Sequence, residues 1–139
     1  MKTLEQAIEI HDQFREDSSM SIDDRFGVRL AKFLPKEDIH RIGLTLKEGA
    51  EWTPKTFTEE NVLAQLKADV EFGWQKACDH RGISSILMFD VVRAWCKVLD
   101  NEFADWDEKS YGDYGTPLFL SVSKKYGFGL NAEDFTPED

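Results

Sequence analysis

The sequence predicts a mainly α-helical protein, a single domain spanning residues 1–139 with about five to six helices around one buried helix near residues 84–99. Apolar residues recur at helical spacing along most of the chain. The segment 84–99 is apolar around nearly its whole circumference, which is typical of a helix inside a bundle. The hydrophobic fraction of 41%, with four Trp and ten Phe, is sufficient to build a core in a chain of this length.

Three short helices are predicted in the N-terminal third. Residues 3–16 form the first, because apolar side chains lie on one face at helical spacing: Leu4, Ala7, Ile8 and Phe14. Ser21 and Asp24 resemble a capping box at the start of the second helix. Pro35 ends that helix and can begin a third at residues 36–42, because the first turn of a helix does not need the missing N–H.

Residues 43–57 are predicted to form either a small β-hairpin or an ordered loop, since apolar residues alternate briefly around a Glu-Gly turn. Thr58 is then an N-cap for a helix that runs to Asp79. Gly73 lies inside this helix, where glycine costs about 1 kcal/mol relative to alanine. Its presence predicts a close helix crossing at that point. Residues 80–82 supply the stop signal.

The predicted central helix begins with Ser84 or Ser85 as its cap. Its few polar residues share one narrow stripe, at spacings of three and four: Asp90, Arg93 and Lys97. We expect the helix ending at Asp79 to be its main packing partner.

A last helix is predicted from Thr116-Pro117 to Gly127, since proline is favoured in a first turn and glycine just after a last one. Residues 128–139 have no helical period. They are expected to form a C-terminal tail, either flexible or pinned to the bundle by an apolar side chain: Phe128, Leu130 or Phe135.

The charge of the chain is −10 and is unevenly distributed. Residues 1–57 carry eleven acids and nine bases, a balance of −2, whereas residues 100–139 carry ten acids and three bases, a balance of −7. Such a field disfavours direct nucleic-acid binding and anionic membrane surfaces, and it favours basic partners. The sequence also lacks a run long enough to span a membrane and an N-terminal signal peptide, so we expect a cytoplasmic protein.

The strongest candidate site is the acidic segment, residues 100–114. Six acids are interleaved there with four aromatic residues and a single lysine. Aromatic side chains anchor interfaces, and carboxylates around them attract a basic partner over long range. We therefore predict a partner-binding site made of Asp100, Glu102, Phe103, Asp105, Trp106, Asp107, Glu108, Tyr111, Asp113 and Tyr114. The alternative is an ordered surface loop whose aromatic rings pack back onto the bundle.

No metal site or cofactor is predicted. Cys78 and His80 make one loosely spaced pair, whereas structural zinc sites usually have paired ligands from two elements. An EF-hand starting at Asp105 fails where Lys109 and Ser110 replace the expected ligand and glycine. The two cysteines are expected to remain free thiols, because Cys78 and Cys96 would lie too far apart along two antiparallel helices.

The sequence contains no nucleophile elbow, phosphate-binding loop or dinucleotide motif. An acid–base enzyme with a site at the bundle edge remains an alternative, because such sites are assembled in space and need no motif. It would require a deep pocket holding a histidine beside a carboxylate: His11, His40 or His80. A helix-turn-helix regulator is a second alternative, since residues 75–95 loosely resemble that motif around Gly82.

The leading interpretation is a non-enzymatic acidic protein that binds a basic protein surface through the acidic segment. One form is an inhibitor that presents carboxylates in place of nucleic-acid phosphates. The chain is similar in size, charge and helicity to small acidic helical inhibitors encoded by phages and mobile elements. The sequence does not identify the partner or the oligomeric state.

Overall fold

The computed structural model describes residues 1–17, 23–41, 54–106 and 114–136. Within these ranges the chain forms six α-helices and no strand, which confirms the prediction of a mainly helical protein. The predicted hairpin or loop at 43–57 lies largely outside the described residues, and 54–57 are neither helix nor strand. The elements in order are α1 (Leu4–Asp17), α2 (Asp23–Leu30), the 3-10 turn η1 (Ala31–Phe33), α3 (Lys36–Arg41), α4 (Glu59–Cys78), α5 (Gly82–Leu99), α6 (Thr116–Tyr126) and the 3-10 turn η3 (Ala132–Asp134).

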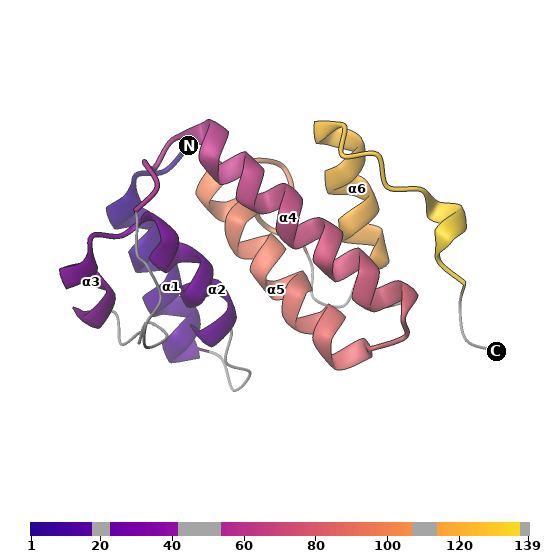
Figure 1. Ribbon diagram of the computed structural model, residues 1–139, viewed down its shortest axis with the longest axis horizontal. Helices are drawn as coiled ribbons and strands as arrows, with labels where there is room; N and C mark the ends of the chain where they lie inside the picture. Colours follow the sequence, from indigo (N-terminus) through magenta and orange to yellow (C-terminus); the bar gives the residue numbers. More distant parts are fainter. Residues whose placement is uncertain (18–22, 42–53, 107–113, 137–139) are drawn as a thin grey trace.

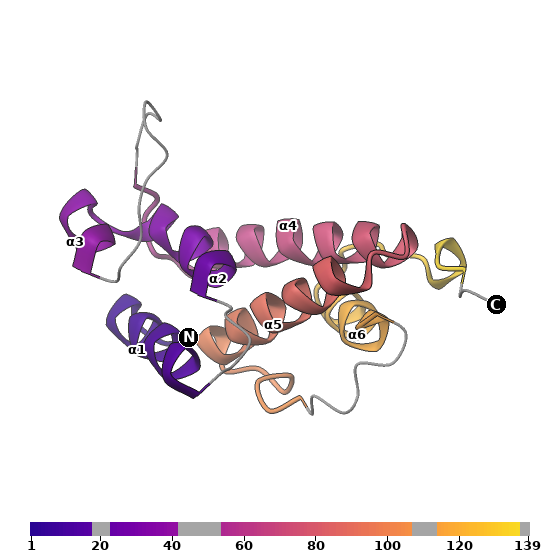
Figure 2. The same cartoon turned by 90° about the horizontal axis from the view of Figure 1, so that it is seen from below.

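Helices α4 and α5 form a hairpin that runs through the middle of the molecule, and they lie side by side along most of their length (Figure 1). The pairing predicted for the central helix is therefore confirmed. Helices α1 and α2 pack against one end of α5, and α6 packs mainly against α4 at the other end. Seen from below, α2 and α4 lie in one layer, and α1, α5 and α6 in the other (Figure 2).

Helix α5 is the centre of the core, as its apolar sequence predicts. Trp95, Phe89 and Val92 are completely buried, and Trp95 packs edge-on against Phe26 of α2 at a centroid distance of 4.9 Å. Two residues of the polar stripe of α5, Asp90 and Arg93, are buried. Arg93 donates a hydrogen bond to the carbonyl of Trp106, in the chain that follows the helix.

The start of α5 differs from the prediction. The helix begins at Gly82, and neither Ser84 nor Ser85 caps it, since the hydroxyl of Ser85 donates to the carbonyl of Gly82. The left-handed backbone at the preceding turn falls on His80, with φ 55°, rather than on the glycine. Gly82 is required for space instead, because a Cβ there would lie 2.7 Å from the Tyr114 ring.

Other helix ends follow the sequence more closely. Thr58 caps α4 by accepting a hydrogen bond from the Asn61 amide at 3.2 Å, as predicted. Helix α1 has a capping box that the sequence reading missed, in which Thr3 and Gln6 each accept a bond from the other's backbone amide. The predicted box at Ser21 lies outside the described residues.

Candidate functional site

The acidic segment begins where α5 ends. Asp100 has a left-handed backbone, with φ 56°, and the next amide, that of Asn101, donates back to the Cys96 carbonyl at 3.3 Å. The side chain of Asn101 fixes the turn, since its oxygen accepts from the Phe103 amide and its nitrogen donates to the Tyr126 hydroxyl, both at 2.9 Å. The segment is thus anchored to α6 at its first residues.

The carboxylates of the described part of this segment all lie on the surface. Asp100 is paired with Lys2, and Glu102 with Lys125 at 2.9 Å. The hydrogen bond from Lys125 lowers the pKa of Glu102, and the same bond raises the pKa of Lys125. Asp105 is exposed and has no basic partner among the described residues. Two of these three carboxylates are therefore already matched by a lysine of the same chain.

The three aromatic residues of the segment that the structure describes, Phe103, Trp106 and Tyr114, pack against other parts of the chain. Phe103 belongs to the core, so its ring is unavailable to a partner, contrary to the prediction for this residue. Trp106 is half-buried against Phe103, with ring centroids 5.9 Å apart, and its carbonyl accepts a hydrogen bond from Arg93. Tyr114 packs on the turn between α4 and α5, 5.8 Å from the ring of His80. The remaining predicted site residues lie outside the described ranges: Asp107, Glu108, Tyr111 and Asp113.

The most strongly buried charged group is one that the sequence reading did not single out. Asp69 of α4 is 2% exposed, and its carboxylate accepts hydrogen bonds from Arg29 of α2 at 2.5 Å and from the Trp95 indole of α5 at 2.8 Å. Gln65, one turn earlier on α4, adds a third bond at 3.1 Å and in turn accepts one from Lys32. A polar residue on the apolar face of α4 was the available signal for this network.

Burial raises the pKa of Asp69, while the ion pair with Arg29 and the bonds from Trp95 and Gln65 act in the opposite direction. Both oxygens of the carboxylate are occupied by donors from the chain itself. This arrangement ties three helices together, and burial keeps the carboxylate away from solvent. We therefore assign the Asp69 network a structural role.

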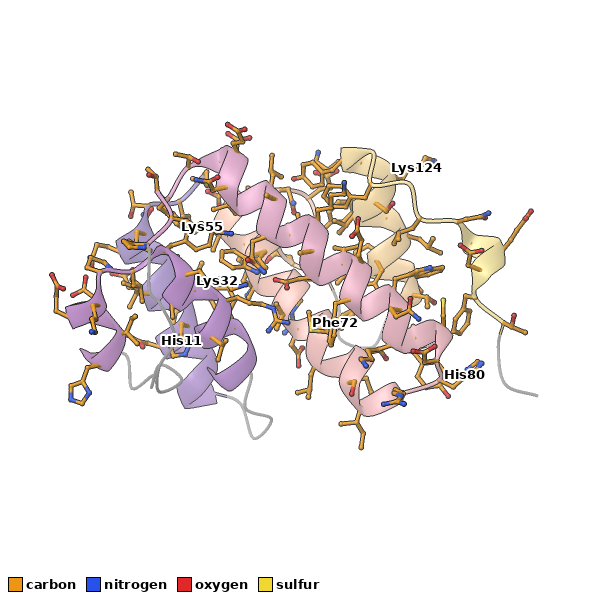
Figure 3. The ribbon with its side chains drawn as sticks, viewed as in Figure 1. His11, Lys32, Lys55, Phe72, His80 and Lys124 are labelled. Atoms are coloured by element: carbon orange, nitrogen blue, oxygen red, sulfur yellow. The ribbon has the colours of Figure 1, made fainter. Side chains whose placement is uncertain are left out.

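His11 is a second buried polar side chain, and it lies outside the Asp69 network. It lies on α1 (Figure 3). It is completely buried, and its ring stacks on that of Phe26 with ring centroids 6.3 Å apart. Its Nδ1 lies 3.4 Å from a carboxylate oxygen of Asp12, and its Nε2 has no hydrogen-bond partner among the described residues. A buried polar atom left in this way destabilises the fold by about 1–3 kcal/mol.

Replacing His11 by leucine is expected to leave the free energy of unfolding unchanged or to raise it by about 1 kcal/mol, because an apolar side chain of similar volume removes the unsatisfied nitrogen. Urea denaturation measures the change. Exposed His40 on α3, changed in the same way, is the control and should alter stability by less than about 0.5 kcal/mol. A loss of more than about 2 kcal/mol at position 11 would mean that the imidazole makes a polar contact that leucine cannot replace.

The histidines do not form the site that an acid–base enzyme requires. His11 is sealed in the core, His40 is exposed, and His80 is packed between the rings of Tyr114 and Phe135. A surface pocket of about 430 Å³ lies between α6 and the chain that follows it, lined mainly by apolar side chains with Ser123 and Lys124. It contains no histidine and no carboxylate.

The described ranges also bear on two other classes of site, a metal centre and a DNA-reading helix. No group of three or more His, Cys, Asp or Glu side chains is placed there so that it could hold a metal ion. The cysteines are free, as predicted, and burial raises the pKa of Cys96 to about 12. A recognition helix needs an exposed polar face. Most residues of α5 from Met88 onward are buried, which disfavours the helix-turn-helix alternative.

None of the helices in the described ranges has both the length and the apolar character needed to cross a membrane. Compared with protein-family models, with curated proteins and with solved structures, the chain matches none of them.

Proposed function

We propose that the protein is a non-enzymatic acidic binding protein whose acidic segment contacts a basic surface of a partner protein. The observation that supports this most directly is the distribution of carboxylates after α5. Every described acid from residue 100 onward is exposed: Asp100, Glu102, Asp105, Glu133 and Asp134. Together with the net charge of −7 over residues 100–139, they give this part of the chain a negative surface that attracts a basic partner.

The ion pairs within the chain indicate which acids would contribute to binding a basic partner. Asp100 and Glu102 are held by lysines, so a partner's basic group would have to compete with Lys2 and Lys125 for them. Asp105 has no such competitor among the described residues, and the half-buried Trp106 follows it directly. We therefore place the centre of the proposed contact at Asp105 and the residues that follow it, including Asp107 and Glu108. Inhibition of a nucleic-acid-binding protein is one form of this function.

The test is charge neutralisation at the proposed centre. In a variant with Asp105→Asn, Asp107→Asn and Glu108→Gln, we expect affinity for a partner recovered by affinity capture to fall at least tenfold, because each rim charge contributes to attraction. The dependence of affinity on salt should weaken at the same time. Isothermal titration at two salt concentrations measures both quantities.

A matched variant neutralises three exposed acids on other helices, Glu9→Gln, Glu37→Gln and Glu71→Gln, and changes the net charge by the same amount. It should bind the partner within about twofold of the unmodified protein. Equal losses in both variants would indicate that only the total charge matters. No loss in the first variant would exclude the acidic segment as the contact surface.

A further inference from the structure

The chain that follows α6 crosses to the far end of α4, where the hairpin turns into α5 (Figure 1). Residues 127–136, here called the C-terminal strap, contain no buried residue, and η3 is their only regular element. Three apolar side chains of the strap are half-buried and pack against the core: Phe128, Leu130 and Phe135.

The strap is fastened near its start and near its end. At its start the Phe128 amide donates to the Ser123 carbonyl and the Leu130 amide to the Ser123 hydroxyl, both at 3.0 Å. Between these bonds and η3 the strap stands away from α6, and the 430 Å³ pocket occupies that space. Gly127 and Gly129 both have positive φ, at 71° and 81°, so the backbone here adopts a conformation that glycine reaches without strain.

The far fastening is a single aromatic side chain. The ring of Phe135 lies 5.9–6.2 Å from the rings of His80, Tyr114 and Trp74, with interplanar angles of 50–69°. These tilted and edge-on arrangements are favourable for aromatic pairs. Two of the three surrounding groups are also held in left-handed backbone conformations, His80 at φ 55° and Tyr114 at φ 60°, which side-chain-bearing residues seldom adopt.

Carboxylates of the strap and of the end of α4 both lie near the Cys78 thiol. Asp134 of the strap and Asp79 at the end of α4 both lie close enough to the Cys78 thiol to raise its pKa, in addition to the larger effect of burial. Both carboxylates therefore lie near the thiol, one on the strap and one at the end of α4. Cys78 is partly buried and lies one helical turn after Trp74, so its thiol is close to the part of the strap that contacts the tryptophan.

We propose that residues 131–136 can detach from the bundle. In the attached state Phe135 occupies a site formed by Trp74, His80 and Tyr114. Release of Phe135 exposes this aromatic surface and makes Cys78 more accessible. The site binds a phenylalanine side chain, and in the structure that side chain is Phe135 of the strap itself. This inference does not depend on the proposed binding to a basic partner, because its test needs no partner, although Tyr114 belongs both to the acidic segment and to this site.

Thiol labelling with the neutral reagent N-ethylmaleimide tests the proposal on the full chain. Phe135→Ala is expected to speed labelling of Cys78 at least tenfold, since the variant removes the plug and shifts the local opening equilibrium. Labelling of Cys96, which is buried at the middle of the core, should keep its original rate. Mass spectrometry of the labelled peptides separates the two thiols.

Two further variants complete the design. Phe135→Tyr keeps the ring and should label at the slow rate of the unmodified protein, whereas Phe72→Ala removes an exposed ring from α4 and should not change the rate. The proposal is overturned by an unchanged Cys78 rate in Phe135→Ala, or by equal acceleration in Phe135→Tyr. Equal acceleration of Cys96 overturns it as well, since the strap would then be an integral part of the fold.

Discussion

Replacing Asp69 by alanine is expected to lower the free energy of unfolding by about 3–5 kcal/mol, the largest effect that we predict for a single substitution. The change removes the acceptor shared by Arg29, Trp95 and Gln65. Of these donors, the Trp95 indole is completely buried and the Arg29 side chain is 16% exposed, so water cannot fully replace the carboxylate. Urea denaturation followed by far-ultraviolet circular dichroism measures the loss.

The Asp69→Asn variant is the matched control, because it keeps the shape and one acceptor oxygen but removes the charge. We expect it to lose less than half as much stability as Asp69→Ala. If alanine at this position costs under about 1 kcal/mol, the network does not stabilise the junction between α2, α4 and α5.

The pH dependence of the two proteins provides a second measurement. Because burial raises the pKa of Asp69 in the folded state, its contribution to stability is fully present below the unfolded pKa and is lost as pH rises through the folded value. The stability of the unmodified protein relative to Asp69→Asn should therefore decrease from about pH 3 upward and become constant once the folded carboxyl has ionised. A difference that increases with pH would show that the ion pair with Arg29 outweighs burial.

Gly73→Val is expected to lower the free energy of unfolding by about 3 kcal/mol, and Gly73→Ala by about 1–2 kcal/mol. A Cβ at this position would lie 2.6 Å from the Phe119 ring and 3.0 Å from the Cβ of Met88. Both neighbours are buried, and the ring is enclosed by the core between α4 and α6, so the clash is relieved only by moving a helix. Thermal and urea denaturation measure whether stability decreases in the order glycine, alanine, valine at position 73.

The exposed position 64 on the same helix separates helix propensity from packing. There Ala64→Gly should cost about 1 kcal/mol, so that alanine is preferred where nothing contacts the side chain. At position 73 we expect the opposite preference. Combining Gly73→Ala with Phe119→Leu should recover part of the loss, because the shorter side chain frees the space. Independent, additive effects would mean that the ring does not determine the need for glycine.

The sequence predicted the elements whose signals are local. The N-cap at Thr58, the proline-initiated helix at Thr116 and the close crossing at Gly73 all follow from neighbouring residues, and the structure confirms them. The start of α5 was misjudged, because serine is a common cap and glycine a common terminator, whereas here Gly82 opens the helix to make room for Tyr114.

Features that depend on contacts between distant segments could not be predicted from neighbouring residues. The polar stripe of α5 looks solvated until the chain after it folds back, which brings the Trp106 carbonyl to Arg93. Phe103 looks like an interface anchor among acids until the Asn101 turn directs it into the core. The pattern of acids could be read from the sequence, but their pairing with Lys2 and Lys125 depends on where two distant segments lie.

The carboxylate of Asp69 also bears on how the chain selects its own register during folding. The buried face of α4 is apolar apart from Gly73, Gln65 and Asp69, and Asp69 is its one ionisable side chain. Any apolar helix can cover such a face, but only a helix with a cation at the matching position can neutralise the carboxylate. Arg29, which lies 40 residues before Asp69 in the sequence, supplies that cation. We expect the aspartate to exclude misdocked arrangements that a leucine would tolerate, so that this residue contributes uniqueness to the fold as well as stability. Stopped-flow refolding of Asp69→Leu tests this expectation, because misdocked arrangements would add slow phases to the refolding kinetics. A single refolding phase identical to that of the unmodified protein would exclude such a role.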